Sequence, residues 1–562
     1  MKRLRWQILL ILITLVAITT LLLLQQPVTR VLVSQPSGGG SYTEALIGQI
    51  SRLNPLLDWN NEADRSIDRL LYSALFRFDE RGIPHPDLAE SWGVSPEGDI
   101  YNITLRANAR WHDGTPLTSD DVLFTIDLMR GGASLFPKDV QELWQKVEVR
   151  KLDDHNLKFV LPEPFAPFLD YLTFGILPRH LLGTIPPDQL ANADFNLRPI
   201  GSGPFAFDHF LVKDGTIQGV VLKVSAQYYQ TKPYLEEIVF QTYPDARAAL
   251  EAFQKGEVMG IAQITPEILD SALAEPNLAL YSTRLPQVTL VLLNLNNPEV
   301  PFFQNVAVRR ALLLAINREY LIQKALKGQG ILADSPILPG SWAYYDGIEP
   351  IPYQPEEAEM LLRQEGYLLA PGETVRAKEG ERLEFTLLYP DDALHGEIAR
   401  LLVADWQRIG VAVTPQAVAM EKLVQDHLSP RAYQAALIDL NLSRTPDPDP
   451  YPFWHQSEVT GGQNYSQWDN RSASEYLEQA RVTTDVGLRQ RLYRNFQIVF
   501  QRELPALLLY YPVYTYGVSR QMQKVQIPPL YEPSDRFAFL AMWSLNTRRV
   551  LVEVTPATTT TP

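Results

Sequence analysis

Hydrophobic positions form one long run at the start of the chain. Trp6–Leu24 is nineteen residues long, its polar members are Gln7 and three threonines, and three basic residues precede it. A helix rises about 1.5 Å per residue, so this run approaches the roughly 30 Å hydrocarbon core of a bilayer. Basic residues before such a run favour a cytoplasmic N-terminus. We therefore expect a cytoplasmic end at 1–5, a single-pass transmembrane anchor at 6–24, and an extracytoplasmic remainder.

A cleaved signal peptide is the alternative interpretation of this run. Such peptides usually have an apolar region of about 7–15 residues and a small-x-small cleavage site. Here the run is longer, and the residues after Leu24 contain no such site. No cysteine follows that an acyl chain could modify, so a lipoprotein anchor is excluded. We favour the uncleaved anchor, with secretion after signal cleavage as the alternative.

The segments next to the anchor and at the end of the chain show no periodic pattern. Residues 25–41 end in SQPSGGGS, a composition typical of flexible tethers. Residues 546–562 become rich in threonine and proline. We predict a flexible tether and a disordered tail.

From Tyr42 onward, helical patterns alternate with short strand patterns. Helices are indicated by apolar residues at 3.6-residue spacing, and strands by alternation or short apolar runs. The predicted helices are Ile67–Phe76, Val122–Met129, Ala246–Gln254, Val308–Ala325, Pro355–Gln364, Ile398–Arg408 and Leu488–Arg502. The predicted strands are Tyr101–Leu105, Val147–Val149, Leu157–Leu161, Glu237–Thr242, Val288–Leu295, Leu383–Tyr389, Ala435–Leu440 and Ala506–Tyr511. This alternation predicts an α/β protein with at least two lobes.

Composition narrows the class of protein further. The chain is 46% hydrophobic and 10% aromatic, which is typical of a packed globular protein. The absence of cysteine excludes disulfides, zinc–thiolate sites and cysteine nucleophiles. A net charge of −15 argues against nucleic acid as a partner.

Catalytic motifs are absent from the sequence. It contains no HExxH, no glycine-rich phosphate loop and no dinucleotide fingerprint. Gly201-Ser202-Gly203 lacks the spacing of a nucleophile elbow and predicts a turn before a strand. His112 and Asp113 are adjacent on a predicted turn, where they cannot easily face one another. We predict no enzymatic activity, no metal site and no cofactor.

The segment Arg444–His455 (RTPDPDPYPFWH) is the best candidate for ligand binding. Four prolines fix φ and stiffen the loop that carries Asp447 and Asp449. Aromatic rings follow, ending in Trp454, and Asn464 comes soon after. A rigid loop with acids and rings suits recognition of a polar organic ligand. The rings can equally fill the core beneath a surface turn, and the sequence leaves both interpretations open.

Several motifs occur in an order typical of one family. They are Leu53–Leu56 (LNPL), Pro86–Trp92 (PDLAESW), Trp111–Leu117 (WHDGTPL), Asp120–Val122 (DDV), Gly201–Phe205 (GSGPF), Lys232–Ile238 (KPYLEEI), Val308–Leu312 (VRRAL), Ala315–Arg318 (AINR), the Asp-Pro motif at 447–450 and Glu503–Pro505 (ELP). Together they resemble the extracytoplasmic solute-binding proteins of ABC transporters, oligopeptide/dipeptide/nickel type (family 5). The resemblance extends from about Tyr42 to Gln521.

The resemblance implies a periplasmic-binding-protein type II fold. Two α/β lobes are then joined by two crossing strands, and they close over a ligand by hinge motion. The crossings are expected near 288–300 and 505–515. The expected ranges are lobe 1 at 42–290 with an inserted subdomain at about 85–200, lobe 2 at 291–505, and a return to lobe 1 at 506–545.

The resemblance also implies a function. It predicts a monomeric, non-catalytic receptor that captures short peptides outside the membrane and delivers them to ABC permease and ATPase subunits. Sugars, opines or nickel chelates are alternative ligands, and a sensory module without transport is an alternative role. An anchored hydrolase is a third. The expected ligand-binding residues are Asn54 and Asn296, from family motifs alone, and Arg444, Asp447, Asp449, Trp454 and Asn464.

Two departures from the family pattern stand out. A membrane helix takes the place of the lipid anchor that many members carry. Peptide-binding members place an acid about three residues before the Asp-Pro step, where it pairs with the ligand's α-amine. Arg444 and Pro446 occupy that position in the two possible registers. Specificity for a peptide N-terminus is therefore in question.

Overall fold

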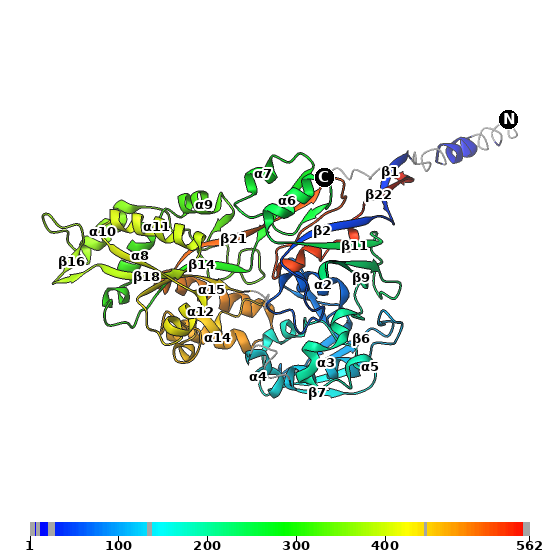
Figure 1. Cartoon of the computed structure of the whole chain (residues 1–562), viewed down its shortest axis with the longest axis horizontal. Coiled ribbons are helices and arrows are strands. Elements are labelled where there is room, and N and C mark those ends of the chain that lie inside the picture. The colour runs from blue at the N-terminus through cyan, green and yellow to red at the C-terminus, as the bar shows by residue number, and fades with distance from the viewer. Residues whose placement is uncertain (1–5, 7–11, 21–28, 132–137, 443–446, 555–562) are drawn as a thin grey trace.

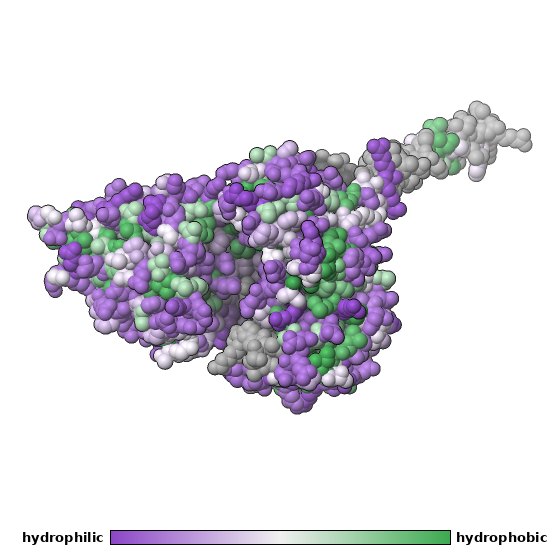
Figure 2. All heavy atoms as spheres, in the orientation of Figure 1, coloured by the Kyte–Doolittle hydropathy of each residue, from purple (hydrophilic) through white to green (hydrophobic). Residues whose placement is uncertain are grey.

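A computed structural model describes residues 6, 12–20, 29–131, 138–442 and 447–554. The described part forms two lobes that lie side by side (Figure 1). The first contains the N-terminal half of the chain and, in the lower part of the view, a smaller subdomain. Space-filling atoms show a hollow between the lobes (Figure 2).

One mixed sheet passes through both lobes. Its order is β19-β18-β20-β14-β21-β12-β2-β11-β10-β9, and β13 and β15 also pair with β21. The lobe 1 strands are β2 (Ser41–Ile47), β9 (Phe205–Lys213), β10 (Thr216–Val224), β11 (Glu237–Tyr243), β12 (Gly260–Ile261) and β13 (Leu278–Arg284). The lobe 2 strands are β14 (Gln287–Leu293), β15 (Gly330–Leu332), β18 (Glu384–Pro390), β19 (Ala412–Val418) and β20 (Ala435–Asn441), and β21 (Ala506–Ser519) belongs to both lobes.

The lobes meet where β21 changes partners. Its first half pairs antiparallel with β14, and its second half pairs antiparallel with β13, starting at Val513 opposite Arg284. Pro512, which has no N–H to donate to a ladder, lies at this change of partner. The chain therefore crosses between lobes twice, at 284–287 and at 510–513.

Lobe 2 buries its sheet on both faces. Val291 and Leu293 of β14 point into one core, and Val288, Leu290 and Leu292 point into the other. This alternation follows from the two-residue period of a strand and explains the continuous apolar run in the sequence. The first core includes residues of α8 (Val306–Leu314), α9 (Arg318–Leu326), α10 (Pro355–Gln364) and α11 (Ala393–Arg408), and the second includes residues of α14 (Arg471–Val482) and α15 (Val486–Glu503).

The subdomain of lobe 1 has a four-stranded sheet of its own. Its order is β5 (Ala89–Val94), β6 (Ile100–Leu105), β8 (Asn156–Val160) and β7 (Glu148–Lys151). The helices α3 (Ser119–Gly131) and α4 (Lys138–Lys146) pack beside it (Figure 1). Trp144 of α4 makes edge contacts with Phe168 and Phe174, so this small core reaches the hollow between the lobes.

The predicted strands and most of the predicted helices are confirmed, but two helices need correction. The predicted helix at 308–325 is two helices, because Asn317 caps α9: its side chain accepts from the Tyr320 amide at 2.9 Å. The amide of Asn317 also donates to Asp405 at 2.9 Å, which holds the break in place. The helix predicted at 67–76 is α2 (Glu62–Leu71), because Asn61 caps it earlier and the chain is extended from Tyr72.

The predicted tether and tail contain paired strands. β1 (Thr29–Ser37) pairs antiparallel with β22 (Asn546–Val554), from Thr29 opposite Val554 to Ser37 opposite Asn546. Each segment is short, and its partner is more than 500 residues away, so neither pattern alone predicts the pairing. Residues 25–28 and 555–562 lie outside the described residues.

The structure describes the predicted anchor only in part. Residues 12–20 are helical and exposed, while 7–11 and 21–24 lie outside the described residues. Among the residues that are described, none of the helices combines the length and the apolar character needed to cross a membrane.

Candidate functional site

A cavity with a volume of about 1120 Å³ lies between the two lobes. Small-molecule pockets usually measure about 300–1,000 Å³ and occur preferentially at domain interfaces. This cavity, which we call the cleft, is therefore large enough for an extended organic solute. Its walls come from α2 and the subdomain on one side, from the loops after β20 on the other, and from residues 531–534 of the returning chain.

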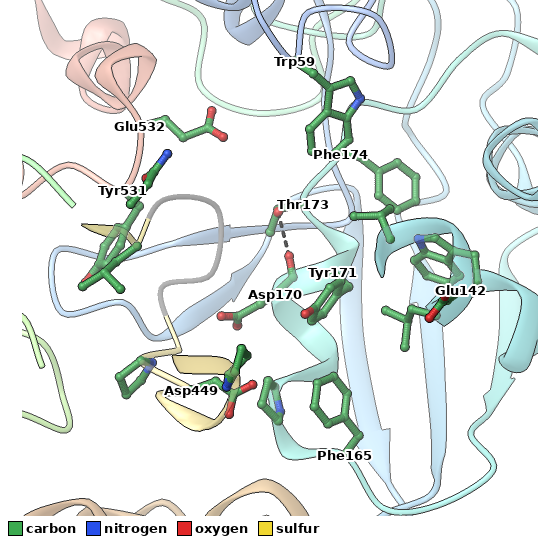
Figure 3. A pocket seen from close by; sticks show the side chains of 18 of the residues that line it. Trp59, Glu142, Phe165, Asp170, Tyr171, Thr173, Phe174, Asp449, Tyr531 and Glu532 are labelled. Carbon is green, nitrogen blue, oxygen red and sulfur yellow. Dashed lines mark hydrogen bonds between the residues drawn. The ribbon is translucent and has the colours of Figure 1, made fainter. Parts of the chain in front are cut away.

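Aromatic rings line much of the cleft (Figure 3). Trp59, Phe165, Tyr171 and Phe174 come from lobe 1, and Phe453 comes from lobe 2. Large rings contribute apolar contact area with little loss of conformational entropy on binding. This lining suits the apolar parts of organic ligands of varied shape.

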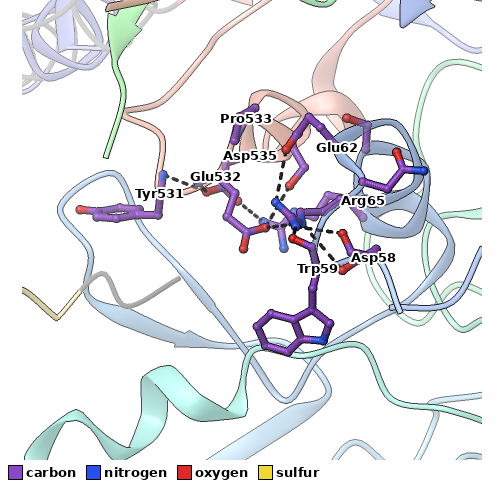
Figure 4. A network of polar contacts seen from close by, with 12 residues as sticks. Asp58, Trp59, Glu62, Arg65, Tyr531, Glu532, Pro533 and Asp535 are labelled. Atoms are coloured by element: carbon purple, nitrogen blue, oxygen red, sulfur yellow. Dashed lines mark hydrogen bonds and ion pairs between the residues drawn. The ribbon is translucent and has the colours of Figure 1, made fainter. Parts of the chain in front are cut away.

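A charged network contributes to the wall of the cleft (Figure 4). The Arg65 guanidinium lies 3.8 Å from Asp58, 3.9 Å from Glu532 and 3.3 Å from Glu62. Burial lowers the pKa of Arg65, but these three carboxylates outweigh burial and raise it. Burial raises the pKa of Glu62 to about 7. The network ties α2 to the segment that follows β21.

Asp447 is buried and fully engaged within the protein. Its carboxylate lies 2.6 Å from Arg489 Nη1 and accepts a second bond from Nη2 at 2.9 Å. The Tyr493 hydroxyl donates to it at 3.3 Å. The backbone amide of Asp447 donates to Asp170 of the subdomain at 2.5 Å. Asp447 therefore fixes the loop of lobe 2 and contacts lobe 1, and it does not line the cleft.

Asp449 lines the cleft and is paired with Arg481. Two parallel bonds join them, from Nε to Oδ1 at 2.9 Å and from Nη2 to Oδ2 at 2.7 Å. The Arg481 guanidinium lies over the Tyr451 ring at 3.9 Å and over the Phe165 ring at 5.7 Å. Arg481 thus extends from lobe 2 to an aromatic ring of lobe 1.

Trp454 and Asn464 lie in the core of lobe 2. Trp454 is 3% exposed and makes an edge contact with Phe500 at a centroid distance of 4.8 Å. The Asn464 amide donates to the carbonyls of His455 and Trp468 at 3.1 and 2.8 Å. Of the two interpretations of the aromatic loop, core packing therefore describes Trp454, whereas its neighbour Phe453 lines the cleft.

The two residues expected from family motifs lie elsewhere. Asn54 is buried, donates to Asn196 at 2.9 Å and accepts from the Leu56 amide at 3.1 Å. It shapes the turn whose Pro55 lines the cleft. Asn296 is exposed in a separate hollow of about 550 Å³ on lobe 2. Arg444 lies outside the described residues, so Asp449 alone among the predicted and described residues lines the cleft.

Sequence reasoning missed the lobe 1 wall, including Trp59, Asp68, Asp170 and Tyr171. One signal was present. Asp64 and Asp68 are four residues apart and lie on one face of a helix. The sequence pattern predicts a helix that begins only at Ile67, so Asp64 falls outside it and the shared face with Asp68 is not apparent.

The WHDG and GSG motifs form one structural unit. The His112 ring accepts from the Gly201 amide at 3.1 Å and bonds the Gly203 carbonyl at 3.0 Å. Burial lowers the pKa of His112 to about 4, so the ring is neutral. A Cβ at Gly201 would lie 1.9 Å from the Leu71 carbonyl oxygen, so only glycine fits there. Neither motif lines the cleft.

Comparison with known proteins identifies this architecture. The family model described as bacterial extracellular solute-binding proteins, family 5 Middle, matches residues 84–463. The chain belongs to this family. The resemblance seen in the sequence motifs is therefore confirmed.

Two relatives of this family 5 protein are similar to it over most of its length. The oligopeptide-binding protein AppA of Bacillus subtilis is 28% identical over 494 residues, which cover 85% of this chain and 87% of AppA. The dipeptide-binding protein of Escherichia coli is 27% identical over 470 residues, covering 79% and 84% of the two chains. Both names describe binding proteins and not enzymes.

Solved structures show the same two-lobe fold. AppA of Bacillus subtilis in complex with a nonapeptide is 26% identical, with a TM-score of 0.68 and coverage of 91% of this chain and 100% of AppA. NikZ of Campylobacter jejuni in complex with Ni(L-His) is 25% identical, with a TM-score of 0.68 and coverage of 90% and 99%. The expected two-lobe α/β architecture is confirmed.

Proposed function

We propose that this protein is the substrate-binding component of an ABC importer that captures short peptides outside the membrane. The observation that carries the proposal is the cleft, which is about 1120 Å³ in volume and lined by both lobes. Relatives named for oligopeptides and dipeptides, and a matching structure that holds a nonapeptide, support peptides as the ligand class. The protein binds and releases its ligand without catalysis and passes it to a permease with its ATPase.

Capture follows from the hinge between the lobes. The two crossings at 284–287 and 510–513 are the backbone connections about which the lobes rotate. Polar contacts between the lobes include the Asp447 amide with Asp170 at 2.5 Å and the Trp342 amide with the Arg81 carbonyl at 3.0 Å. A ligand that contacts both walls adds interactions that exist only in the closed state, so it shifts the population toward closure.

We assign direct ligand contact to Asp449 and to the rings that line the cleft, with Phe453 and Trp59 on opposite walls. Asp447, Asn54, Trp454 and Asn464 act indirectly, by fixing the loops that form these walls.

Residues 6–24 form the anchor in this proposal. The apolar run and the basic residues before it support a membrane location for the mature protein. Mass spectrometry of the native protein tests this directly. A mature N-terminus beyond residue 24 would show cleavage and secretion instead.

A thermal-shift screen tests the ligand class. A ligand present at a hundred times its Kd stabilises the folded state by about 2.7 kcal/mol. We expect stabilisation by peptides of two to nine residues. Stabilisation by sugars, opines or nickel chelates with no response to peptides would overturn the peptide assignment, and steady turnover of a bound ligand would overturn the receptor role.

A further inference from the structure

The lobe 1 wall of the cleft contains a buried carboxylate without a partner. Asp68 lies on α2, lines the cleft and is 3% exposed. Among the described residues, no side chain pairs with either of its carboxylate oxygens. The backbone N–H of Asn54 is close enough to lower the pKa of Asp68, but its hydrogen bond goes to the Arg52 carbonyl at 3.1 Å. Buried charges in folded proteins are normally paired, because an unpaired one loses its hydration without compensation. An unpaired acid facing a ligand cleft indicates that its partner arrives with the ligand.

The neighbours of Asp68 do not neutralise it. Asp64, one turn earlier on α2, accepts from the amides of Ser51 and Arg52 at 2.8 and 3.0 Å. Burial, together with the negative charges of Asp58 and Asp64, raises the pKa of Asp68. The absence of a partner is therefore specific to Asp68 among the acids on its face of the helix.

The nearby cations are committed to other acids. Arg65 is shared among Asp58, Glu62 and Glu532 (Figure 4). Arg69 lies 3.1 Å from Asp535. Within the part of the chain that the structure describes, these geometries leave Asp68 at the cleft without a cation of its own.

The cleft as a whole favours positive charge. Among the described residues, eight acidic side chains line it against four basic ones, Arg65, Arg69, Lys146 and Arg481. The three arginines among these bases pair with carboxylates. Trp59, Tyr171 and Phe174 add ring faces, which attract cations through their quadrupoles (Figure 3).

We propose that the cleft selects solutes that carry an ammonium or guanidinium group, and that Asp68 is the acceptor for that group. The inference rests on the proposed function, in that the cleft is taken as the ligand site. Within that function, it defines the substrate class as peptides with a lysine or arginine side chain. A free polyamine presents the same chemistry without a peptide, and the experiment separates the two.

Calorimetric titration of the full chain tests the proposal. The probes are spermidine and the N-acetylated peptides Ala-Lys-Ala, Ala-Arg-Ala and Ala-norleucine-Ala. Acetylation removes the α-ammonium, and norleucine keeps the lysine hydrocarbon without the side-chain ammonium. We expect the two basic peptides to bind the wild type at least about tenfold more tightly than the norleucine peptide, as for a charge-assisted hydrogen bond. Asp68→Asn should remove this preference, and Asp68→Glu should retain part of it. Asp127→Asn, which changes an exposed acid on α3 outside the cleft, should leave the preference unchanged.

The outcomes distinguish a failure of the cationic subsite from a failure of peptide capture. Equal affinity of the wild type for lysine and norleucine peptides overturns the cationic subsite and leaves peptide capture standing. Binding of spermidine without binding of any peptide supports the subsite and overturns peptide capture. Binding of none of the four probes overturns both. The wild-type ratio tests the subsite even if Asp68→Asn fails to fold, and an unchanged ratio in a folded Asp68→Asn overturns the role of Asp68.

Discussion

Acidic side chains near the cleft differ between the lobes in whether they are paired within the protein. On lobe 2, Asp447 pairs with Arg489 and Asp449 pairs with Arg481, each through two nitrogens. On lobe 1, Asp68 has no hydrogen-bond partner within the described chain. The paired acids hold the loop in place and contribute little uncompensated charge, whereas the unpaired acid keeps its capacity for a ligand. Asp447 and Asp449 therefore contribute rigidity, and Asp68 is available for recognition.

The largest expected effect comes from breaking a buried pair on lobe 2. Arg489→Met leaves Asp447 buried without its cation, and such losses cost about 3–5 kcal/mol. Denaturant unfolding measures the change. Arg471→Met, which removes an exposed pair with Glu475, is the control and should cost about 0.5 kcal/mol or less. A loss below about 1 kcal/mol for Arg489→Met would contradict the structural role of Asp447.

The second test separates two adjacent rings of the same loop. Trp454→Ala empties a core position and should destabilise the protein by about 3–4 kcal/mol. Phe453→Ala removes a ring from the cleft wall, so it should weaken ligand binding more than stability. Thermal unfolding and titration with one peptide measure both quantities in both variants. Weakened binding without destabilisation in Trp454→Ala would reverse the assignment.

The third test concerns Asp68, whose substitution should increase the stability of the protein, whereas the first two should decrease it. Asp68→Asn should stabilise the unliganded protein by about 1–2 kcal/mol at pH values above the raised pKa of Asp68, because an unsatisfied buried charge is removed there. Urea unfolding of both proteins at several pH values measures the difference.

The pH dependence of this difference follows from the raised pKa of Asp68. Between the ordinary and the raised pKa, the folded state binds more protons than the unfolded state, so folding stability falls as pH rises. The advantage of Asp68→Asn should therefore be smallest below about pH 4 and grow as pH rises through the raised pKa. An advantage that shrinks with rising pH would contradict this sign.

The smallest expected effect is at Asn296. This side chain is exposed and lies outside the cleft, so Asn296→Ala should change stability by about 0.5 kcal/mol or less and leave peptide affinity unchanged. Titration with the peptide used for Phe453→Ala gives the comparison. A clear loss of affinity would place part of the ligand site on the other hollow of lobe 2.

The fold could be predicted from sequence to a greater extent than the site. Buried strands such as Val288–Leu295 and Ala506–Tyr511 follow from apolar runs. These signals are local. The pairing of β1 with β22 is not local, and neither segment is apolar enough to suggest it alone.

The site depends on tertiary contacts that no pattern encodes. Phe453 and Trp454 are adjacent rings, and only the packing of α15 decides which of them is buried. Asp64 and Asp68 share a helix face. The amides of Ser51 and Arg52 donate hydrogen bonds to Asp64, whereas neither of them reaches Asp68. Asp447 belongs to the motif recognised in the sequence, yet its role follows from Arg489, forty-two residues later.

The pairing of β1 with β22 has a mechanical consequence. The outer end of this ribbon joins Thr29 to Val554, so a force applied between the two chain ends loads the hydrogen bonds one pair at a time. An isolated two-stranded ribbon is only marginally stable. Under tension it should unzip at low force and release nine residues from each end, each adding about 3.3–3.6 Å of extended chain. The lobes would then bear the load only after this slack has been taken up.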